Sequence, residues 1–392
     1  MNENHGPDTV APGFFLPSNP SGRTMSSSAK RDSAGGSSVA VVQVDPMEDP
    51  AWDEKLRPWP DACIFHTAAW ARVLHATYGF KPCYLTLTDD RRTVSILPLM
   101  EVDSWVTGRR GVALPFTDAC TPLAEDSAGL GVLYREARRH GQVRNWKRIE
   151  YRTECAGTSR ANAATPYVGH RLDLSGDEAA RFRRMQSGAR GAVRKATKQG
   201  VTCTTGTDLG SVQAFYRLFC ATRKRLGVPP QPFRFFASIQ REVLARDGGF
   251  VVLAWHEGAP VAGAVFFHFG RTATYKFAAS NATGRSLGAS NLVLWEAICH
   301  YAPRGLRVLD LGRTAQADEG LKHFKRALGA TEYGLDYANH DPRQGGRIEP
   351  SSLEVSLGWS RWAFKKLPVV VLRFVGGLLY RHMAAFALYS QI

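Results

Sequence analysis

The sequence predicts an α/β (α+β) chain made of two similar halves, each with a mixed, largely antiparallel sheet flanked by helices. Two apolar runs around a polar turn give Cys83–Val102 the pattern of a hairpin. The same pattern returns in Phe250–Phe269, and Thr272–Ser280 adds a third strand. Small and polar residues gather between the two copies at Ala156–Thr165, which indicates a boundary there.

The first half should begin with the short β-rich run Val39–Val44. A helix is expected within Phe65–Phe80, where apolar residues recur close to helical spacing, namely Trp70, Val73, Leu74 and Tyr78. Residues 1–38 are rich in Ser, Gly, Pro and Asn, which is typical of a disordered leader. We therefore expect an N-terminal domain over residues 39–160.

The second half should place helices on both sides of its three-stranded meander. Two helical segments, Asp177–Gln199 and Asp208–Leu226, precede the meander and are separated by a short predicted strand. A helix in Ala289–Ala302 and a strand in Leu306–Gly312 follow it. These elements indicate a C-terminal domain over residues 161–341.

Residues 342–392 are predicted to be a linker followed by an apolar and basic tail. Arg373 and Arg381 interrupt the apolar residues, so no uncharged run reaches the roughly 20 residues that a membrane-spanning helix needs. Two interpretations stay open. The tail could dock on the protein's own core, or it could lie on a membrane surface with aromatic and basic residues near the headgroups, namely Trp359, Trp362, Lys365 and Lys366.

The composition favours anionic partners and a reducing compartment. The net charge of +15 suits nucleic acid, phosphorylated cofactors or acidic lipid. The seven cysteines are scattered, with no CxxC pair and no Cys/His cluster at zinc-ligand spacing, so we expect free thiols and no metal. The N-terminus lacks the pattern of a signal peptide. We expect a cytoplasmic protein, with the inner face of the cytoplasmic membrane as a further candidate location.

Basic residues on the two helical segments before the meander form a candidate surface for phosphate groups. Arg190 and Arg194 share one face of the first segment and have few acidic partners at i+4 positions. Arg223, on the second segment, would add to the same electrostatic attraction. The plainer interpretation is a solvated helix face.

A glycine-containing segment, Gly284–Asn291, is predicted between the third meander strand and the next helix. At such a junction glycines let the backbone approach a ligand, and the amides of the helix N-terminus can hold an anion. Arg285-x-x-Gly288-x-Ser290 resembles the pyrophosphate loop of GNAT acyltransferases, usually written Q/R-x-x-G-x-G/A, although Ser290 replaces the last small residue. We expect Arg285, Gly288 and Asn291 to contact phosphate.

Seven segments together resemble the FemAB-like branch of the GNAT superfamily over roughly residues 45–340. The likeness is greatest to the FemAB-type proteins found with bacterial exopolysaccharide and sorting systems and to the BioF2-like acetyltransferase domain. The segments are IFHTAAWARVLHATYGFKP, LPLMEVDSWVTGRRGVALPFTDACTPL, GARGAVRKATKQGV, TRKRLGVPPQP, TYKFAASN, NLVLWEAI and LDLGRTAQADEGLKHFKRALGA.

The resemblance implies two GNAT-like folds in tandem and transfer of an acyl or aminoacyl group to an amine of a cell-envelope precursor, in peptidoglycan or exopolysaccharide. It implies acyl-CoA or aminoacyl-tRNA as co-substrate, with no permanently bound cofactor, and it makes tRNA a candidate partner. Two alternatives remain: an acyl-CoA-dependent N-acetyltransferase acting on another small or glycan substrate, and a non-enzymatic basic scaffold that binds RNA or anionic membrane.

Acyl transfer to an amine requires a deprotonated nucleophile, a stabilised oxyanion and neutralised ligand phosphates. We expect Arg313 and Lys325 to bind phosphate, because they flank the strand end at Gly312. Lys276 should point into the same cleft, and Asp310 should orient a cation or the amine. Asp118, in the first half, should lie on the acceptor side. The plainer interpretations are that Asp310 only pairs with a cation, that Lys325 is solvated and that Asp118 caps a turn.

Overall fold

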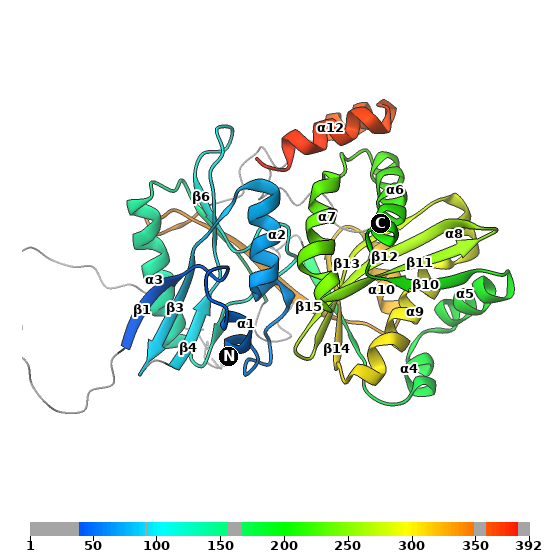
Figure 1. The fold of residues 1–392 in the computed structure, drawn as a ribbon, viewed down its shortest axis with the longest axis horizontal. Helices are drawn as coiled ribbons and strands as arrows, with labels where there is room; N and C mark the ends of the chain where they lie inside the picture. Colours follow the sequence, from blue (N-terminus) through cyan, green and yellow to red (C-terminus); the bar gives the residue numbers. More distant parts are fainter. Residues whose placement is uncertain (1–38, 91, 155–166, 349–357, 383–392) are drawn as a thin grey trace, which may run out of the picture. The chain divides into compact units, whose positions relative to one another are not determined.

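The computed structural model describes residues 39–90, 92–154, 167–348 and 358–382 (Figure 1). The predicted leader, the whole of the predicted boundary segment Ala156–Thr165 and the end of the tail lie outside these ranges. The described strands form two sheets, and helices pack on their faces. The predicted fold class, a mixed α/β chain with two sheets, is confirmed.

The smaller sheet belongs to the first half and has the order β1-β3-β4-β7, antiparallel throughout. The predicted hairpin is its centre. Its strands are β1 (Val39–Val44), β3 (Tyr84–Asp89), β4 (Arg92–Leu97) and β7 (Leu123–Ala124). The helices of this half are α1 (Trp52–Leu56), α2 (Ala68–Tyr78) and α3 (Ser127–Val143), with a 3-10 turn at Ile64–His66.

The larger sheet has the order β10-β11-β12-β13-β14-β9-β15-β8-β6-β5-β2, with β16 beside β15. The first half supplies β2 (Lys81–Pro82), β5 (Met100–Val102), β6 (Arg110–Val112) and β8 (Ile149–Glu154). The rest are β9 (Tyr167–Asp173), β10 (Thr202–Gly206), β11 (Gly249–His256), β12 (Ala259–Phe269), β13 (Thr272–Ser280), β14 (Val308–Ala315), β15 (Thr331–His340) and β16 (Arg347–Ile348).

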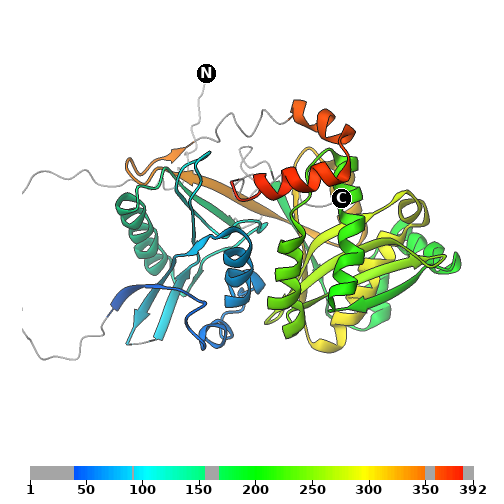
Figure 2. The ribbon, with the colours of Figure 1, turned by 45° about the horizontal axis from the view of Figure 1, so that its top comes forward.

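Strand β15 joins the two halves into one sheet. Its first residues, Thr331–Gly334, pair with β9, and its later residues, Leu335–His340, pair with β8. Figure 2 shows this long strand running from one half into the other. The predicted domain limit at residue 160 stays a prediction. Strand β15, which follows this limit in the sequence, nevertheless pairs with β8 of the first half.

The helices of the second half are α4 (Glu178–Arg184), α5 (Ser187–Lys198), α6 (Leu209–Leu226), α7 (Phe233–Glu242), α8 (Ala282–Leu287), α9 (Ala289–Tyr301) and α10 (Glu319–Ala327), with 3-10 turns at Leu244–Arg246 and Ala302–Arg304. The single helix predicted over Asp177–Gln199 is wrong. Met185 interrupts it with an extended backbone (φ −67°, ψ 142°), and its buried side chain joins the core under α5 and α9.

A second correction concerns the strand predicted to end at Gly312. Strand β14 continues to Ala315, with a bulge between Asp310 and Arg313. Gly312 has φ +69°, a conformation that a residue with a Cβ rarely adopts, and its amide donates to the Asp310 carboxylate over 2.6 Å. The bulge turns Arg313 into the protein interior.

The two halves share one hydrophobic core. Trp70 of α2 packs against Phe235 of α7, with ring centroids 6.0 Å apart, and against Phe267 of β12, at 5.8 Å. The four apolar residues predicted for one helix face are all buried, namely Trp70, Val73, Leu74 and Tyr78. The other face of the second-half sheet is covered by α5 and α9 (Figure 1).

The tail contains α11 (Gly358–Lys366) and α12 (Val369–Leu379). No helix in the described ranges is long and apolar enough to cross a membrane.

Candidate active site

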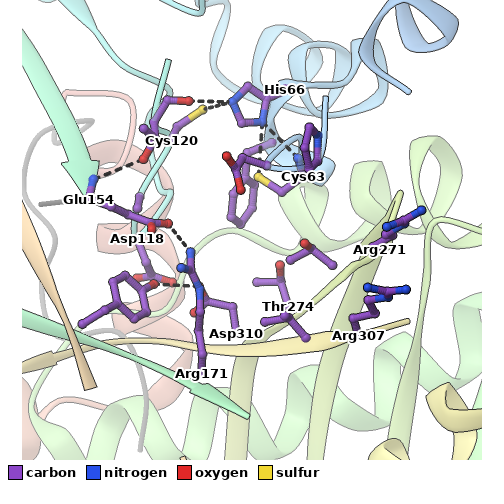
Figure 3. Close-up of a pocket in the computed structure, with 18 residues that line it drawn as sticks. Cys63, His66, Asp118, Cys120, Glu154, Arg171, Arg271, Thr274, Arg307 and Asp310 are labelled. Atoms are coloured by element: carbon purple, nitrogen blue, oxygen red, sulfur yellow. Dashed lines mark hydrogen bonds and ion pairs between the residues drawn. The ribbon is translucent and has the colours of Figure 1, made fainter. Parts of the chain in front are cut away.

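A cavity of about 400 Å³ opens where strand ends of the second half meet loops of the first half (Figure 3). The second half contributes residues at the starts of β13 and β14 together with Arg171 of β9 and Tyr333 of β15. The first half contributes Glu154 of β8 and two loop segments, 60–66 and 118–121. Residues from both halves therefore line this cavity.

Asp310 lines the cavity and is held by three groups. Its carboxylate accepts hydrogen bonds from the Gly312 amide and the Tyr333 hydroxyl, each over 2.6 Å, and lies 3.6 Å from the Arg171 guanidinium. The Tyr333 ring fits because Gly169 faces it: a Cβ at Gly169 would lie 2.1 Å from the ring. A carboxylate has about four acceptor sites, so Asp310 can still accept a proton from a ligand.

Glu154 is a second carboxylate of the cavity and shares Arg171 with Asp310. The guanidinium of Arg171 lies 4.2 Å from the centre of the Tyr333 ring, which fixes its plane. Burial raises the pKa of Asp310 and of Glu154 above the ordinary value, although Arg171 opposes the shift in both. Carboxylates with raised pKa values are better matched to proton transfer near neutral pH.

Two arginines on the opposite side of the cavity were not predicted from the sequence. Arg271 and Arg307 stand at the starts of β13 and β14, and the amide of Arg307 donates to the carbonyl of Arg271 over 2.9 Å. Both side chains are exposed, and no carboxylate of the described residues forms an ion pair with either guanidinium. Figure 3 shows them across the cavity from Glu154 and Asp118.

A histidine between two cysteines also lines the cavity. The Nε2 atom of His66 lies 3.0 Å from the carbonyl of Thr121, which can only accept, so Nε2 carries the proton. Nδ1 then accepts from the Cys63 amide over 3.1 Å, with the Cys63 Sγ at 3.3 Å. Both ring nitrogens are occupied, with the Cys120 Sγ atom 3.5 Å from Nε2, and burial raises the pKa of Cys63 to about 12, so we assign this cluster to the wall of the cavity.

Asp118, Lys276 and Arg313 form a buried ion triad where the halves meet. The Asp118 carboxylate lies 2.8 Å from the Lys276 ammonium and 3.5 Å from the Arg313 guanidinium. Burial would raise the pKa of Asp118, but the two cations hold it below the ordinary value. Asp118 lines the cavity, whereas Lys276 does not. Lys276, predicted to enter the cleft, contacts the lining residue Asp118 instead, and its predicted role in the reaction stays a prediction.

Arg313 and Lys325 are buried, and their predicted phosphate contacts stay a prediction. Arg313 packs between two rings, with its guanidinium 4.5 Å from the centre of Tyr167 and 5.6 Å from that of Tyr337. The ammonium of Lys325 donates to the carbonyls of Gly312 and Arg313 over 2.9 and 3.1 Å. Burial lowers the pKa of Lys325 to about 7. Both cations support the bulge of β14 and do not line the cavity.

The segment predicted as a pyrophosphate loop is largely helical. The Asn281 side chain accepts from the Gly284 amide over 2.8 Å and begins α8, so Arg285 lies inside a helix and donates to the Ser280 carbonyl. Gly288 has φ +75°, and a Cβ there would lie 3.1 Å from Ala192 of α5. Asn291 is half-buried in the first turn of α9. Gly288 therefore allows the start of α9 to pack closely against α5.

The three arginines predicted as an outer electrostatic surface have different surroundings. Arg190 donates to the carbonyls of Arg183 and Met185 and so closes the end of α4. Arg194 is exposed and lies over the Phe182 ring at 5.4 Å, so it alone fits the prediction of a solvated cation. Arg223 is buried and donates to the hydroxyl of Tyr380 over 2.7 Å, so it anchors the tail.

Residues 183–326 match the acetyltransferase (GNAT) domain family. This segment is a GNAT acetyltransferase domain. It contains the meander, α9, β14 and nearly all of α10, and therefore carries Asp310 together with Arg271 and Arg307. The chain thus has a GNAT-type acyltransferase domain, as the resemblance implies. A comparison with curated proteins finds no match to the sequence.

Three solved structures share the fold. The crystal structure of FemX has 12% identity and a TM-score of 0.61, covering 76% of this chain and 96% of FemX. A tandem GNAT protein from the clavulanic acid biosynthesis pathway has 12% identity and a TM-score of 0.50, covering 78% of this chain and 99% of that one. The C-terminal domain of a putative lysylphosphatidylglycerol synthetase from Agrobacterium fabrum has 11% identity and a TM-score of 0.50, covering 81% of this chain and 94% of that domain. At these identities the likeness shows the fold alone.

Proposed function

We propose that this protein transfers an acyl or aminoacyl group to an amine of a cell-envelope precursor, and that the cavity around Asp310 is the reaction site. The observation that carries the proposal is Asp310 itself, a carboxylate of raised pKa that lines a cavity of about 400 Å³ next to the GNAT strand pair β13 and β14. The substrate class rests on the resemblance of the sequence segments to the FemAB-like branch, and the fold that this chain shares with FemX over 76% of this chain is compatible with it.

The reaction requires the acceptor amine in its neutral, deprotonated form. An acceptor ammonium is attracted to Asp310 and Glu154, and Asp310 takes its proton. The amine nitrogen then forms a bond to the acyl carbon of the donor. The bond to the donor's oxygen or sulfur breaks, and that atom leaves with the electron pair and takes up the second proton, which the nitrogen loses as the amide forms. Arg171 keeps both carboxylates in place, and the ion triad of Asp118, Lys276 and Arg313 holds the adjoining wall.

Arg271 and Arg307 take the phosphate-binding role in this proposal. Two exposed guanidiniums on hydrogen-bonded neighbouring strands repel each other unless an anion lies between them. UDP-linked and lipid-linked precursors, acyl-CoA and aminoacyl-tRNA all carry phosphate.

The double variant Arg271→Ser/Arg307→Ser should raise the KM for a UDP-linked amine acceptor by about 10²-fold to 10⁴-fold, since each of the two charge-assisted hydrogen bonds is worth about 1.5–3 kcal/mol. The KM for the same amine without the nucleotide should stay unchanged. Arg304→Ser is the matched control, because Arg304 is exposed nearby but pairs with Asp247 over 3.4 Å. Equal KM values for the double variant and this control would rule out the phosphate role.

The donor is tested by offering labelled acyl-CoA and labelled aminoacyl-tRNA in parallel, each with envelope precursors as acceptors. Transfer of either label to an amine supports the proposal and identifies the donor. The helical form of Ala282–Leu287 leaves no open loop there for a pyrophosphate, which favours aminoacyl-tRNA. If neither label moves, the transferase proposal fails and the non-enzymatic scaffold gains support. We propose that the reaction takes place in the cytoplasm.

A further inference from the structure

Helix α12 is fixed to the protein by one face. Leu372 is fully buried, and a Cβ at Gly376 would lie 1.9 Å from the carbonyl oxygen of Pro230, so the helix backbone touches the protein directly. Tyr380 donates to the Pro229 carbonyl over 3.1 Å and accepts from Arg223. The tail therefore docks on the protein, which was one of the two alternatives that the sequence left open.

The opposite face of α12 is apolar and exposed. Val370, Phe374 and Leu378 follow one another at intervals of four residues, with exposures of 74%, 69% and 57%. Val371 adds to the same face. A helix that docks by one face normally turns polar residues to water on the other. The apolar outer face therefore indicates a partner.

Neighbouring segments extend this apolar surface. The loop after β5 exposes Trp105 and Val106 at the end of α12, where the Trp105 ring lies 5.4 Å from the His382 ring. The Ser104 hydroxyl lies within hydrogen-bond distance of His382 Nδ1, at 3.0 Å, and so helps to hold the His382 ring in this position. Trp362 of α11 is also exposed. Of the eleven exposed large hydrophobic residues in the described ranges, seven lie in these segments, so their clustering is not accidental.

The same segments carry positive charge. Lys365, Lys366, Arg373 and Arg381 are exposed, and residues 358–382 contain no Asp or Glu. A second copy of this chain would bring like charges together on this face. An anionic lipid surface instead offers both an apolar interior for the aliphatic side chains and negative headgroups for the cations. Tryptophan at the rim suits the headgroup region.

We propose that α12, with Trp362 of α11 and the loop at Trp105, is a membrane-binding surface that lies in the plane of an anionic phospholipid bilayer. This inference goes beyond the proposed function and does not depend on it, because lipid binding is measured without substrate. It would give the protein access to membrane-linked acceptors.

The test is sedimentation of the full-length protein with vesicles of phosphatidylcholine alone and with vesicles that also contain phosphatidylglycerol. The unaltered protein should sediment with the anionic vesicles. The triple variant Val370→Glu/Phe374→Glu/Leu378→Glu should weaken this binding by about tenfold or more, since charged residues are costly at the apolar boundary.

The matched control is Val39→Glu/Val42→Glu/Val143→Glu, which adds the same charge at exposed positions outside these segments. It should sediment almost like the unaltered protein. Equal binding of the two triple variants would overturn the proposal, as would the absence of binding to anionic vesicles. Light scattering completes the test: a dimer that the α12 variant dissociates, without vesicle binding, would show that a second copy covers this face instead.

Discussion

Replacing Asp310 by asparagine is expected to slow transfer by about 10²-fold to 10⁴-fold while leaving the protein folded, because a general base contributes an acceleration of this size. Asparagine keeps the shape of the side chain, and its oxygen can still accept from the Gly312 amide that Asp310 now contacts at 2.6 Å. It cannot take up the proton that the acceptor amine must lose. The measurement is the rate of label transfer at saturating donor, with thermal unfolding as the check on folding.

Asp336→Asn is the matched control for this experiment. Asp336 lies on β15, as does Tyr333, and pairs with Arg347 over 2.8 Å on the surface. Removal of this exposed ion pair should change the rate little, because such pairs contribute about 0–1 kcal/mol to stability. An Asp310→Asn enzyme as active as the Asp336→Asn control would exclude Asp310 as the base.

The largest loss of stability is expected for Asp118→Asn. This change leaves the Lys276 ammonium and the Arg313 guanidinium, both almost fully buried, without the carboxylate that lies 2.8 and 3.5 Å from them. Removal of one partner from a buried ion pair costs about 3–5 kcal/mol. Lys276→Met should lower the free energy of unfolding by less, because the Asp118 carboxylate still has the Arg313 guanidinium as its ion-pair partner. The free energy of unfolding in urea measures both variants.

The pH dependence of stability provides a second check on the ion triad. The cations lower the folded-state pKa of Asp118 below its unfolded value, which is about 3.9 for an aspartate. The stabilisation is therefore present above the unfolded pKa and is lost as the pH falls through the folded pKa. As the pH falls through this acid range, the free energy of unfolding should decrease by less in Asp118→Asn than in the unaltered protein, because the variant lacks the titrating carboxylate. A variant as stable as the unaltered protein at neutral pH would contradict the triad.

Local patterns predicted the secondary structure well. Alternating apolar runs identified the hairpin of β3 and β4 and the meander of β11, β12 and β13, and helical spacing identified α2 and its buried face. The errors arose where contacts from distant segments decide the backbone. The core draws in Met185 and splits the predicted helix, and the Asn281 cap turns a predicted loop into α8.

The site was harder to predict because burial depends on the whole fold. Sequence reasoning brought Asp310, Asp118, Lys276 and Arg313 together, and the structure places these four residues at one junction of the two halves. It assigned Lys325 to a ligand, since nothing local shows that its ammonium lies beneath the carbonyls of the β14 bulge.

Arg271 and Arg307 were missed because their proximity comes from the pairing of β13 with β14. Their positions at the two strand starts could have drawn attention to them. His66 was missed for the same reason, since its partners Thr121 and Cys120 are more than fifty residues away.

The dependence of the transfer rate on pH tests the central proposal most directly. Asp310 must be ionised to accept a proton, so the rate should rise with pH through its pKa, which burial places above that of an ordinary aspartate. Single-turnover transfer to an amine acceptor should therefore show an acid limb that Asp310→Asn lacks, with a slow residual rate. The same limb and the same rate in both proteins would contradict the assignment of the cavity around Asp310 as the reaction site.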